Sequence, residues 1–183
     1  VHFGYNPEHT IIHDFSVKVE PGQKIAIVGP TGAGKTTIVN LLSRFYNVDR
    51  GTVKIDGIDI SKVTLRSLRE QMGVMMQDSF IFSGTIMDNI RYGNKKASDE
   101  DVIRAEKTVC AHDFIVQMED GYNTQVNERG SRLSVGQRQL ISFARALLAD
   151  PAILILDEAT SSIDTETEIV LQEGLSHLLE GRT

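Results

Sequence analysis

The chain has 183 residues, the length of one ordinary domain, and its 40% hydrophobic and 24% charged content is typical of soluble globular proteins. The net charge of −6 argues against a general nucleic-acid binder, which usually carries a basic stripe, so we expect no nucleic-acid partner. The single cysteine, Cys110, excludes an internal disulfide framework. No apolar run approaches the roughly 20 residues that span a bilayer. The first residue is Val1 rather than Met, and both ends look cut, so we expect a piece of a longer protein.

The first third of the chain is predicted to contain several short strands. Residues 1–5 and 11–19 alternate or are rich in strand-forming side chains, which indicates an antiparallel β element. Residues 24–28 form a short apolar run rich in β-branched side chains, as expected for a buried parallel strand. Helical spacing of apolar residues follows residue 34, and a small hairpin is predicted over residues 52–60.

The rest of the chain is predicted to be mainly helical. Apolar spacing favours helices through most of residues 67–117, and residues 134–148 read as an amphipathic helix that Asp150-Pro151 ends. Further predicted elements are a short strand at 73–76, a capped helix start at 98–101, a buried strand at 153–156 and a last helix at 165–179.

A glycine-rich sequence between the strand predicted at 24–28 and the following helix matches the phosphate-loop pattern G-x-x-x-x-G-K-[ST]. Its glycines let the backbone N–H groups turn toward phosphate oxygens, and the helix that follows adds the positive end of its dipole. Lys35 can reach the β- and γ-phosphates, and the Thr36 hydroxyl can ligate Mg²⁺. The pattern predicts ATP binding. The residues expected to hold the nucleotide here are Gly29, Thr31, Gly32, Ala33, Gly34, Lys35, Thr36 and Thr37.

Two acidic residues, Asp157 and Glu158, end the strand predicted at 153–156. Ligands of open α/β sheets lie at the carboxyl ends of strands, which places both acids beside the phosphate loop. We expect Asp157 to hold Mg²⁺ and Glu158 to act as the general base that deprotonates the attacking water. Without a phosphate loop in the same chain, a solvated strand end or a helix cap would be the better explanation of the two acids.

The segment 133–139, Leu-Ser-Val-Gly-Gln-Arg-Gln, resembles the LSGGQ signature of ATP-binding cassette (ABC) ATPases. Ser134 can cap the following helix, and Gly136 permits close approach of the backbone. The resemblance covers nearly the whole chain. It implies an α/β fold in which a P-loop NTPase core with a parallel sheet carries an N-terminal antiparallel β subdomain and an α-helical signature subdomain. We expect one ABC ATPase domain over 1–183, with the helical subdomain inserted at about 78–140.

The resemblance also assigns roles to individual residues. Tyr5 stands where the family has an aromatic residue that stacks on adenine, and Gln77 where it has a glutamine that contacts Mg²⁺ and the attacking water. Residues 161–164 resemble the loop through which two cassettes communicate. The implied catalytic residues are Glu158, Lys35 and Gln77; the implied Mg²⁺ ligands are Thr36, Gln77 and Asp157; and Ser134, Gly136 and Gln137 would bind the nucleotide of a second cassette.

The segments 78–86, 89–90 and 124–130 look like the exporter branch of the family. In that branch they face transmembrane domains, usually fused N-terminal to the cassette, although Phe80, Ile81 and Phe82 would also suit a core. The resemblance therefore implies a head-to-tail pair of cassettes on the cytoplasmic face of a membrane, using ATP and Mg²⁺ to export a substrate that the sequence does not identify. Whether the pair is a homodimer or a heterodimer stays open.

Two alternatives from the same ATPase class stay open at this stage. Cassettes of DNA-repair and chromosome-organising proteins are interrupted by long coiled coils, whereas here 122 residues separate Lys35 from Asp157 without a heptad run. A soluble cassette acting in translation would carry two cassettes in one chain.

The sequence departs from the family pattern in two places. Val135 replaces the second glycine of the signature, and a β-branched residue restricts the backbone there. The family also has one more strand after residue 183, ending in a histidine that contacts the γ-phosphate. We therefore expect this chain to bind nucleotide better than it hydrolyses it.

Overall fold

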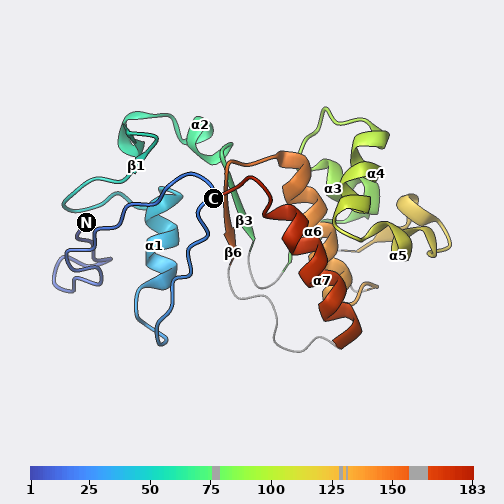
Figure 1. Ribbon diagram of the computed structural model, residues 1–183, viewed down its shortest axis with the longest axis horizontal. Coiled ribbons are helices and arrows are strands. Elements are labelled where there is room, and N and C mark those ends of the chain that lie inside the picture. The colour runs from blue at the N-terminus through green and yellow to red at the C-terminus, as the bar shows by residue number, and fades with distance from the viewer. Residues whose placement is uncertain (76–78, 128–129, 131, 157–164) are drawn as a thin grey trace. The chain divides into compact units, whose positions relative to one another are not determined.

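The structure is a computed structural model that describes residues 1–75, 79–127, 130, 132–156 and 165–183 (Figure 1). Its contacts divide the chain into two compact units. Unit 1 contains residues 1–72 with Thr183, and unit 2 contains residues 73–182. No helix in the described ranges is both long and apolar enough to cross a membrane.

Unit 1 is built around α1 (Lys35–Leu42), the helix that follows the glycine-rich loop (Figure 1). The predicted hairpin is present: β1 (Lys54–Ile55) and β2 (Ile58–Asp59) pair antiparallel across Asp56-Gly57. A short 3-10 helix, η1 (Ile60–Lys62), and α2 (Leu65–Arg69) complete the unit.

Phe3, Ile12 and Leu41 form the small buried core of unit 1. Phe3 and Ile12 exchange two backbone hydrogen bonds of 2.9 and 3.1 Å as an antiparallel bridge. A second antiparallel bridge joins His2 to Arg50. The antiparallel element predicted at the front of the chain is therefore present as isolated bridges, and these hold the first residues against α1.

The strand predicted at residues 24–28 is wrong for this structure, which assigns no strand there. Ile25 and Ile27 are half exposed, and Val28 is 87% exposed. β-Branched side chains favour an extended backbone, but a strand also needs a neighbouring backbone to share its hydrogen bonds. None of the described strands pairs with these residues, so their β propensity is not realised as a ladder.

Unit 2 combines short strands with a group of helices. β3 (Met72–Met75) pairs with β6 (Ile153–Leu156), close to the two strands predicted there. β4 (Gly84–Thr85) pairs antiparallel with β5 (Gln125–Val126). The helical elements are α3 (Ile86–Arg91), α4 (Asp99–Thr108), α5 (His112–Val116), η2 (Gly121–Asn123), α6 (Val135–Ala149) and α7 (Thr165–Leu178).

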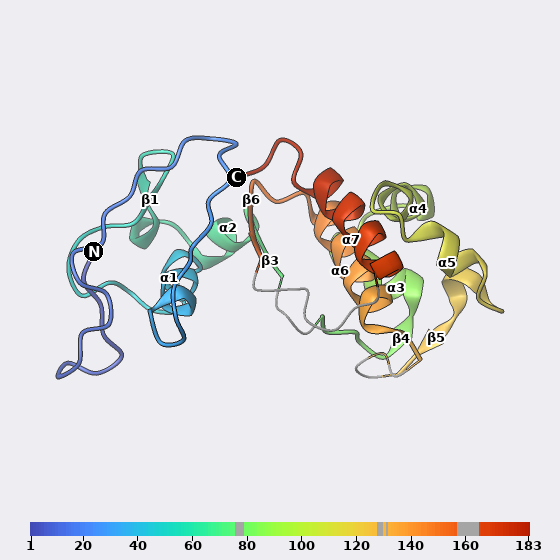
Figure 2. The same cartoon turned by 60° about the horizontal axis from the view of Figure 1, so that its bottom comes forward.

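Helix α6 is the centre of the core of unit 2, with α3, α4 and α7 packed around it (Figure 2). Leu140, Ile141 and Ala144 on α6 are buried, which confirms the apolar side predicted from their spacing. The helix ends where Asp150 adopts a left-handed conformation before Pro151, the stop predicted from the sequence.

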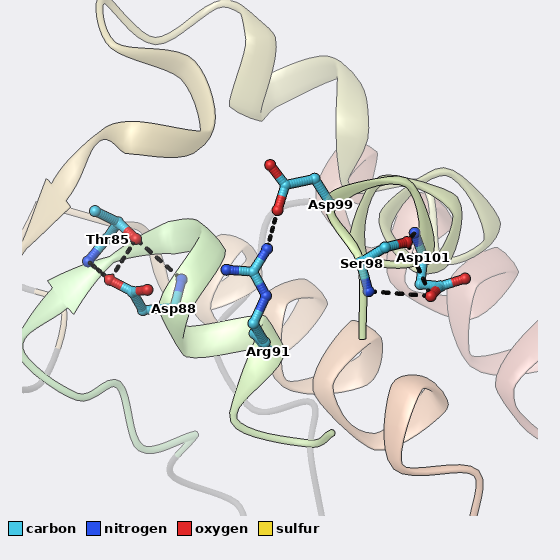
Figure 3. Close-up of polar contacts among 6 residues, drawn as sticks. All are labelled: Thr85, Asp88, Arg91, Ser98, Asp99 and Asp101. Atoms are coloured by element: carbon cyan, nitrogen blue, oxygen red, sulfur yellow. Dashed lines mark hydrogen bonds and ion pairs between the residues drawn. The ribbon is translucent and has the colours of Figure 1, made fainter. Parts of the chain in front are cut away.

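Helices α3 and α4 begin with the same device, a reciprocal capping box (Figure 3). The Thr85 hydroxyl accepts the Asp88 N–H at 2.9 Å, and the Ser98 hydroxyl accepts the Asp101 N–H at 3.2 Å. In return, each aspartate accepts hydrogen bonds from its partner's hydroxyl and N–H, which lowers the pKa of both carboxyl groups. Each cap stabilises its helix by about 1 kcal/mol. Together they confirm the helix start predicted at 98–101.

The loop before α3 is fixed by a buried amide and a buried guanidinium. Asn89 donates to the carbonyls of Phe82 and Thr85, both at 2.9 Å, and its own oxygen accepts the Phe82 N–H at 2.8 Å. Arg145 of α6 donates to Asn89 and, at 2.9 Å, to the Phe80 carbonyl. Burial lowers the pKa of Arg145. The loop is therefore held by polar bonds as well as by packing.

The same loop answers whether residues 80–82 belong to a core. Ile81 is fully buried and joins the core of unit 2. Phe80 is 47% exposed. Phe82 lies between them in burial and packs against the rings of Phe80 and Tyr92. Only the central residue of the segment is a plain core residue.

Glu106 of α4 is an unusual member of the core. Its side chain is fully buried, and neither carboxyl oxygen has a hydrogen-bond partner in the described part of the chain. Burial alone raises the pKa of Glu106 well above its ordinary value. Burial, and to a smaller extent the charge of Glu106, raises the pKa of nearby Tyr122, whose hydroxyl pairs with His112 Nδ1 at 2.8 Å.

We predict that Asn89→Ala destabilises the protein by about 3 kcal/mol, because it leaves several buried backbone groups and Arg145 without a partner. The free energy of unfolding from urea titration measures the effect. Asn123→Ala, at an exposed asparagine of the same unit, is the control and should change the stability by less than about 0.5 kcal/mol. Equal effects of the two substitutions would contradict the structural role of Asn89.

A second prediction concerns pH. Because the pKa of Glu106 is higher in the folded than in the unfolded chain, its full contribution to stability is present below the unfolded pKa, about 4.3, and is lost as the pH rises through the folded pKa. We expect Glu106→Gln to be more stable than the parent at pH 8 by about 1–3 kcal/mol, with the difference shrinking toward pH 4.

Urea titrations of both proteins between pH 4 and 8 measure this difference. The exposed Glu100 lies on the same helix, so Glu100→Gln is the matched control and should not reproduce the trend. If the stability difference between Glu106→Gln and the parent does not vary with pH, the pKa of Glu106 does not differ between the folded and the unfolded chain.

Candidate nucleotide-binding site

The glycine-rich loop ends where α1 begins, and Gly34 makes the junction. Gly34 adopts the left-handed conformation (φ 90°) as the N-cap of α1, and Gly32 also has a positive φ of 84°. A Cβ on Gly34 would lie 2.9 Å from Ile12 Cδ1, so a larger residue fits neither the backbone nor the space. Because Gly34 has no side chain to accept the N–H groups of the first turn, they are left for an external anion.

Lys35 lies back over this loop. Its Nζ atom donates to the carbonyls of Gly29 at 2.7 Å and Pro30 at 3.1 Å. The loop also closes on itself through the Ala33 N–H, which donates to the Pro30 carbonyl at 3.1 Å. The ammonium group and the N-terminal end of α1 thus place positive charge on one short stretch of backbone, a setting that suits phosphate.

Tyr5 belongs to the same unit and contacts the same helix. Its hydroxyl donates to Thr37 Oγ1 at 3.3 Å and accepts from Asn40 Nδ2 at 3.0 Å. Its ring makes edge contacts with Phe3 and Tyr46. The structure therefore brings Tyr5 into contact with Thr37 on the helix that follows the phosphate loop, two predicted site residues that the sequence had associated only through the family resemblance. The contacts of Thr37 and Asn40 could not be foreseen, because they depend on how residues 1–5 lie against α1.

The signature segment lies in unit 2, at the start of α6. Ser134 is the N-cap: its hydroxyl accepts the Gln137 N–H at 3.1 Å, and the Gln137 side chain accepts the Ser134 N–H at 3.0 Å. The helix cap predicted for Ser134 is therefore present. Its hydroxyl hydrogen remains a donor in this arrangement, as binding of an anion would require.

Gly136 faces inward, toward α7. A Cβ built on it would lie 2.2 Å from Thr167 Cγ2, closer than real atoms approach. The close approach expected at this glycine is therefore between two helices of the same unit. Val135 is half exposed, so the β-branched residue that departs from the signature has room at the first turn of α6.

Several predicted site residues lie outside the described residues. These are Gln77, Asp157, Glu158 and the segment 161–164. The Mg²⁺ ligands and the general base therefore stay predictions, with Thr36 the one proposed ligand in the described part of the chain.

The sequence matches the ABC transporter family over residues 12–161, which is most of the chain. The chain belongs to the ABC transporter family. The ATPase class and the mixed α/β fold predicted from the sequence are thereby confirmed.

Relatives support the exporter assignment. The cassette is 58% identical over all 183 residues to the ABC transporter ATP-binding protein YknV of Bacillus subtilis, covering 30% of that protein. It is 48% identical over 181 residues to the mitochondrial iron-sulfur clusters transporter atm1 of Neurospora crassa, covering 25% of it. A solved bacterial Atm1-family ABC exporter with ATP bound shares 45% identity and a TM-score of 0.90, matched over the whole cassette and 32% of the exporter chain.

The cassette thus spans about a third or less of each of these relatives. They are ABC transporter proteins, and the structural neighbour is an exporter. Transport proteins at this identity favour the exporter branch over the DNA-repair and translation alternatives.

The packing of Gly136 gives a prediction that can be tested by compensation. We expect Gly136→Ala to destabilise the protein by about 1–3 kcal/mol, because its methyl group meets Thr167 Cγ2. Thr167→Ser removes that methyl and keeps the hydroxyl, so the double variant should recover at least half of the loss. Thermal unfolding of the two single variants and the double variant measures this coupling. Strictly additive losses would show that the α6–α7 contact is not the cause.

Proposed function

We propose that this cassette binds ATP and, with Mg²⁺, hydrolyses it to power export through transmembrane domains. The observation that carries the proposal is the junction at Gly34. There the start of α1 has no side-chain cap, and the Lys35 ammonium lies on the same loop. Free N–H groups beside a positive charge are the groups that bind a polyphosphate. The ATP-bound state of the solved Atm1-family exporter supports the same ligand.

Within the site, Lys35 would leave the carbonyls of Gly29 and Pro30 to bind β- and γ-phosphate oxygens. The N–H groups of Thr31, Gly32, Gly34, Thr36 and Thr37 would bind the remaining phosphate oxygens, and the Ala33 N–H would join them on leaving the Pro30 carbonyl. The exposed ring of Tyr5 would stack on the adenine. Binding would thus use charge at one end of the nucleotide and an aromatic surface at the other.

Hydrolysis adds water to the γ-phosphorus and breaks its bond to the bridging oxygen, giving ADP and phosphate. Glu158 would accept the proton of the attacking water, and Gln77 would orient that water. Thr36, Gln77 and Asp157 are oxygen donors of the kind that Mg²⁺ prefers. Bound there, Mg²⁺ would neutralise the charge that develops on the phosphate oxygens.

A second cassette would complete the site. Ser134 caps α6 through its oxygen and keeps its hydrogen as a donor, while Gln137 lies one turn further along. We propose that in a head-to-tail pair this helix start, with Ser134, Gly136 and Gln137, meets the γ-phosphate held by the partner's loop. The cassettes would lie on the cytoplasmic face of the membrane. Their closure on ATP and their opening after hydrolysis would change the conformation of the transmembrane domains. The helical part at about 78–140 is proposed to carry this signature as an inserted subdomain.

The general base gives the decisive test. In the full-length protein, Glu158→Gln should lower ATP hydrolysis at least about a hundredfold, because the amide cannot accept the proton. The Kd for ATP should change by less than about threefold. Phosphate release and equilibrium ATP binding measure the two quantities. Glu168→Gln, at an exposed glutamate on α7, is the control. Unchanged hydrolysis in Glu158→Gln would remove Glu158 from the mechanism.

A further inference from the structure

The Tyr5 hydroxyl makes two hydrogen bonds to the helix of the phosphate loop. It donates to Thr37 Oγ1 at 3.3 Å and accepts from Asn40 Nδ2 at 3.0 Å. A phenol has one hydrogen to donate, so these two partners fix the direction of both of its bonds. The hydroxyl is thus engaged on the protein side, while Tyr5 as a whole is 48% exposed.

Both partners lie on one face of α1. Thr37 and Asn40 are three residues apart, a spacing that places their side chains next to each other on a helix. Thr37 is buried and Asn40 is partly buried, which limits how far either can move. The helix that carries them begins at Lys35, so the tyrosine is anchored to the same rigid element as the residues that face the phosphates.

The ring of Tyr5 is fixed on its other sides by aromatic contacts. Phe3 lies at a centroid distance of 5.1 Å with an interplanar angle of 85°, and Tyr46 at 4.9 Å with 81°. Such edge-to-face contacts prefer defined orientations. With its hydroxyl also held, the ring has little freedom to rotate away from one orientation.

We propose that Asn40 is a positioning residue for the nucleobase: with Thr37 it holds the Tyr5 ring at a fixed place relative to the phosphate loop. This inference rests on the proposed role of Tyr5 in stacking on adenine. A ring that is already in place loses less conformational freedom when a base stacks on it, so the base binds more tightly. Asn40 itself does not touch the base, and its effect therefore depends on a base being present but not on which base it is.

Four variants test this in the full-length protein. They are Asn40→Ala, Tyr5→Phe, which removes only the hydroxyl, the double variant Asn40→Ala/Tyr5→Phe, and Tyr5→Leu, which removes the ring. Asn47→Ala, at an exposed asparagine of the same unit, is the control. Isothermal titration calorimetry measures the Kd of each protein for three ligands, all with Mg²⁺. These are a non-hydrolysable ATP analogue, the matching GTP analogue and inorganic tripolyphosphate, which has no base.

We expect Asn40→Ala and Tyr5→Phe each to weaken both nucleotide analogues by about 3- to 10-fold, the range for one lost hydrogen bond. The double variant should bind the nucleotide analogues about as tightly as either single variant, because both substitutions break the same contact. The two losses of affinity should therefore not multiply. Tripolyphosphate affinity should stay within about twofold of the parent in every variant. A residue that only stabilised the fold would lower the affinity for all three ligands together.

Four results would overturn the inference. Equal losses for tripolyphosphate would place Asn40 in the support of the phosphate loop, and a loss confined to the ATP analogue would mean that it reads the base edge. If Asn40→Ala changes nothing while Tyr5→Leu weakens both analogues, the positioning role fails and the stacking role of Tyr5 stands. If Tyr5→Leu also leaves both analogues unaffected, the proposed stacking role fails as well.

Discussion

The left-handed turn at Gly34 is the constraint on which unit 1 depends. It starts α1 directly after the glycine-rich loop, and the space beside it is filled by Ile12. Ile12 is held by its bridge to Phe3, and both pack on Leu41 of the same helix. The few buried side chains of the unit thus support the same junction that leaves the helix start open to an anion. Fold and phosphate recognition are satisfied by one piece of backbone geometry, which is why so small a core can hold the loop.

In helix α6, the residues that face outward and the residues that pack against the rest of unit 2 are different ones. At its start, Ser134 and Gln137 cap the first turn reciprocally, and Ser134 and Val135 are exposed, so this turn faces outward. Gly136, in the same turn, faces α7 so closely that no side chain fits. Further along, Arg145 binds the loop before α3. The residues of one signature therefore serve two surfaces, because successive helical positions are turned by about 100°.

The sequence predicted most of the elements that have strong local signals. The helix caps at Ser98 and Ser134, the turn at Asp56-Gly57 and the apolar side of α6 depend on residues close together in the chain, so the sequence pattern indicates them. The strand predicted at 24–28 failed because a ladder depends on a partner backbone, which β propensity alone does not supply.

In the candidate site, the phosphate loop was predictable from its motif, while the contacts of Tyr5 were not. Tyr5 and Asn40 are 35 residues apart, and nothing in either local sequence indicates that the two side chains meet. The same holds for Asn89 and Arg145, 56 residues apart, which join α3 to α6. Polar pairs of this kind carry no periodicity. They become visible only when the segments that bear them are packed.

The turn between α4 and α5 shows how the core of unit 2 sustains unfavourable local features. Cys110 there has a positive φ of 62°, which costs a residue with a Cβ roughly 1–2 kcal/mol, and Glu106 buries an unpaired carboxyl group one turn earlier. Beside them, Val109, Ala111 and Ile115 are fully buried. Complete burial of one valine or isoleucine contributes about 1.5–3 kcal/mol, enough to offset a left-handed residue. At this turn, a strained residue and an unpaired carboxyl group therefore stand next to side chains whose apolar burial is complete.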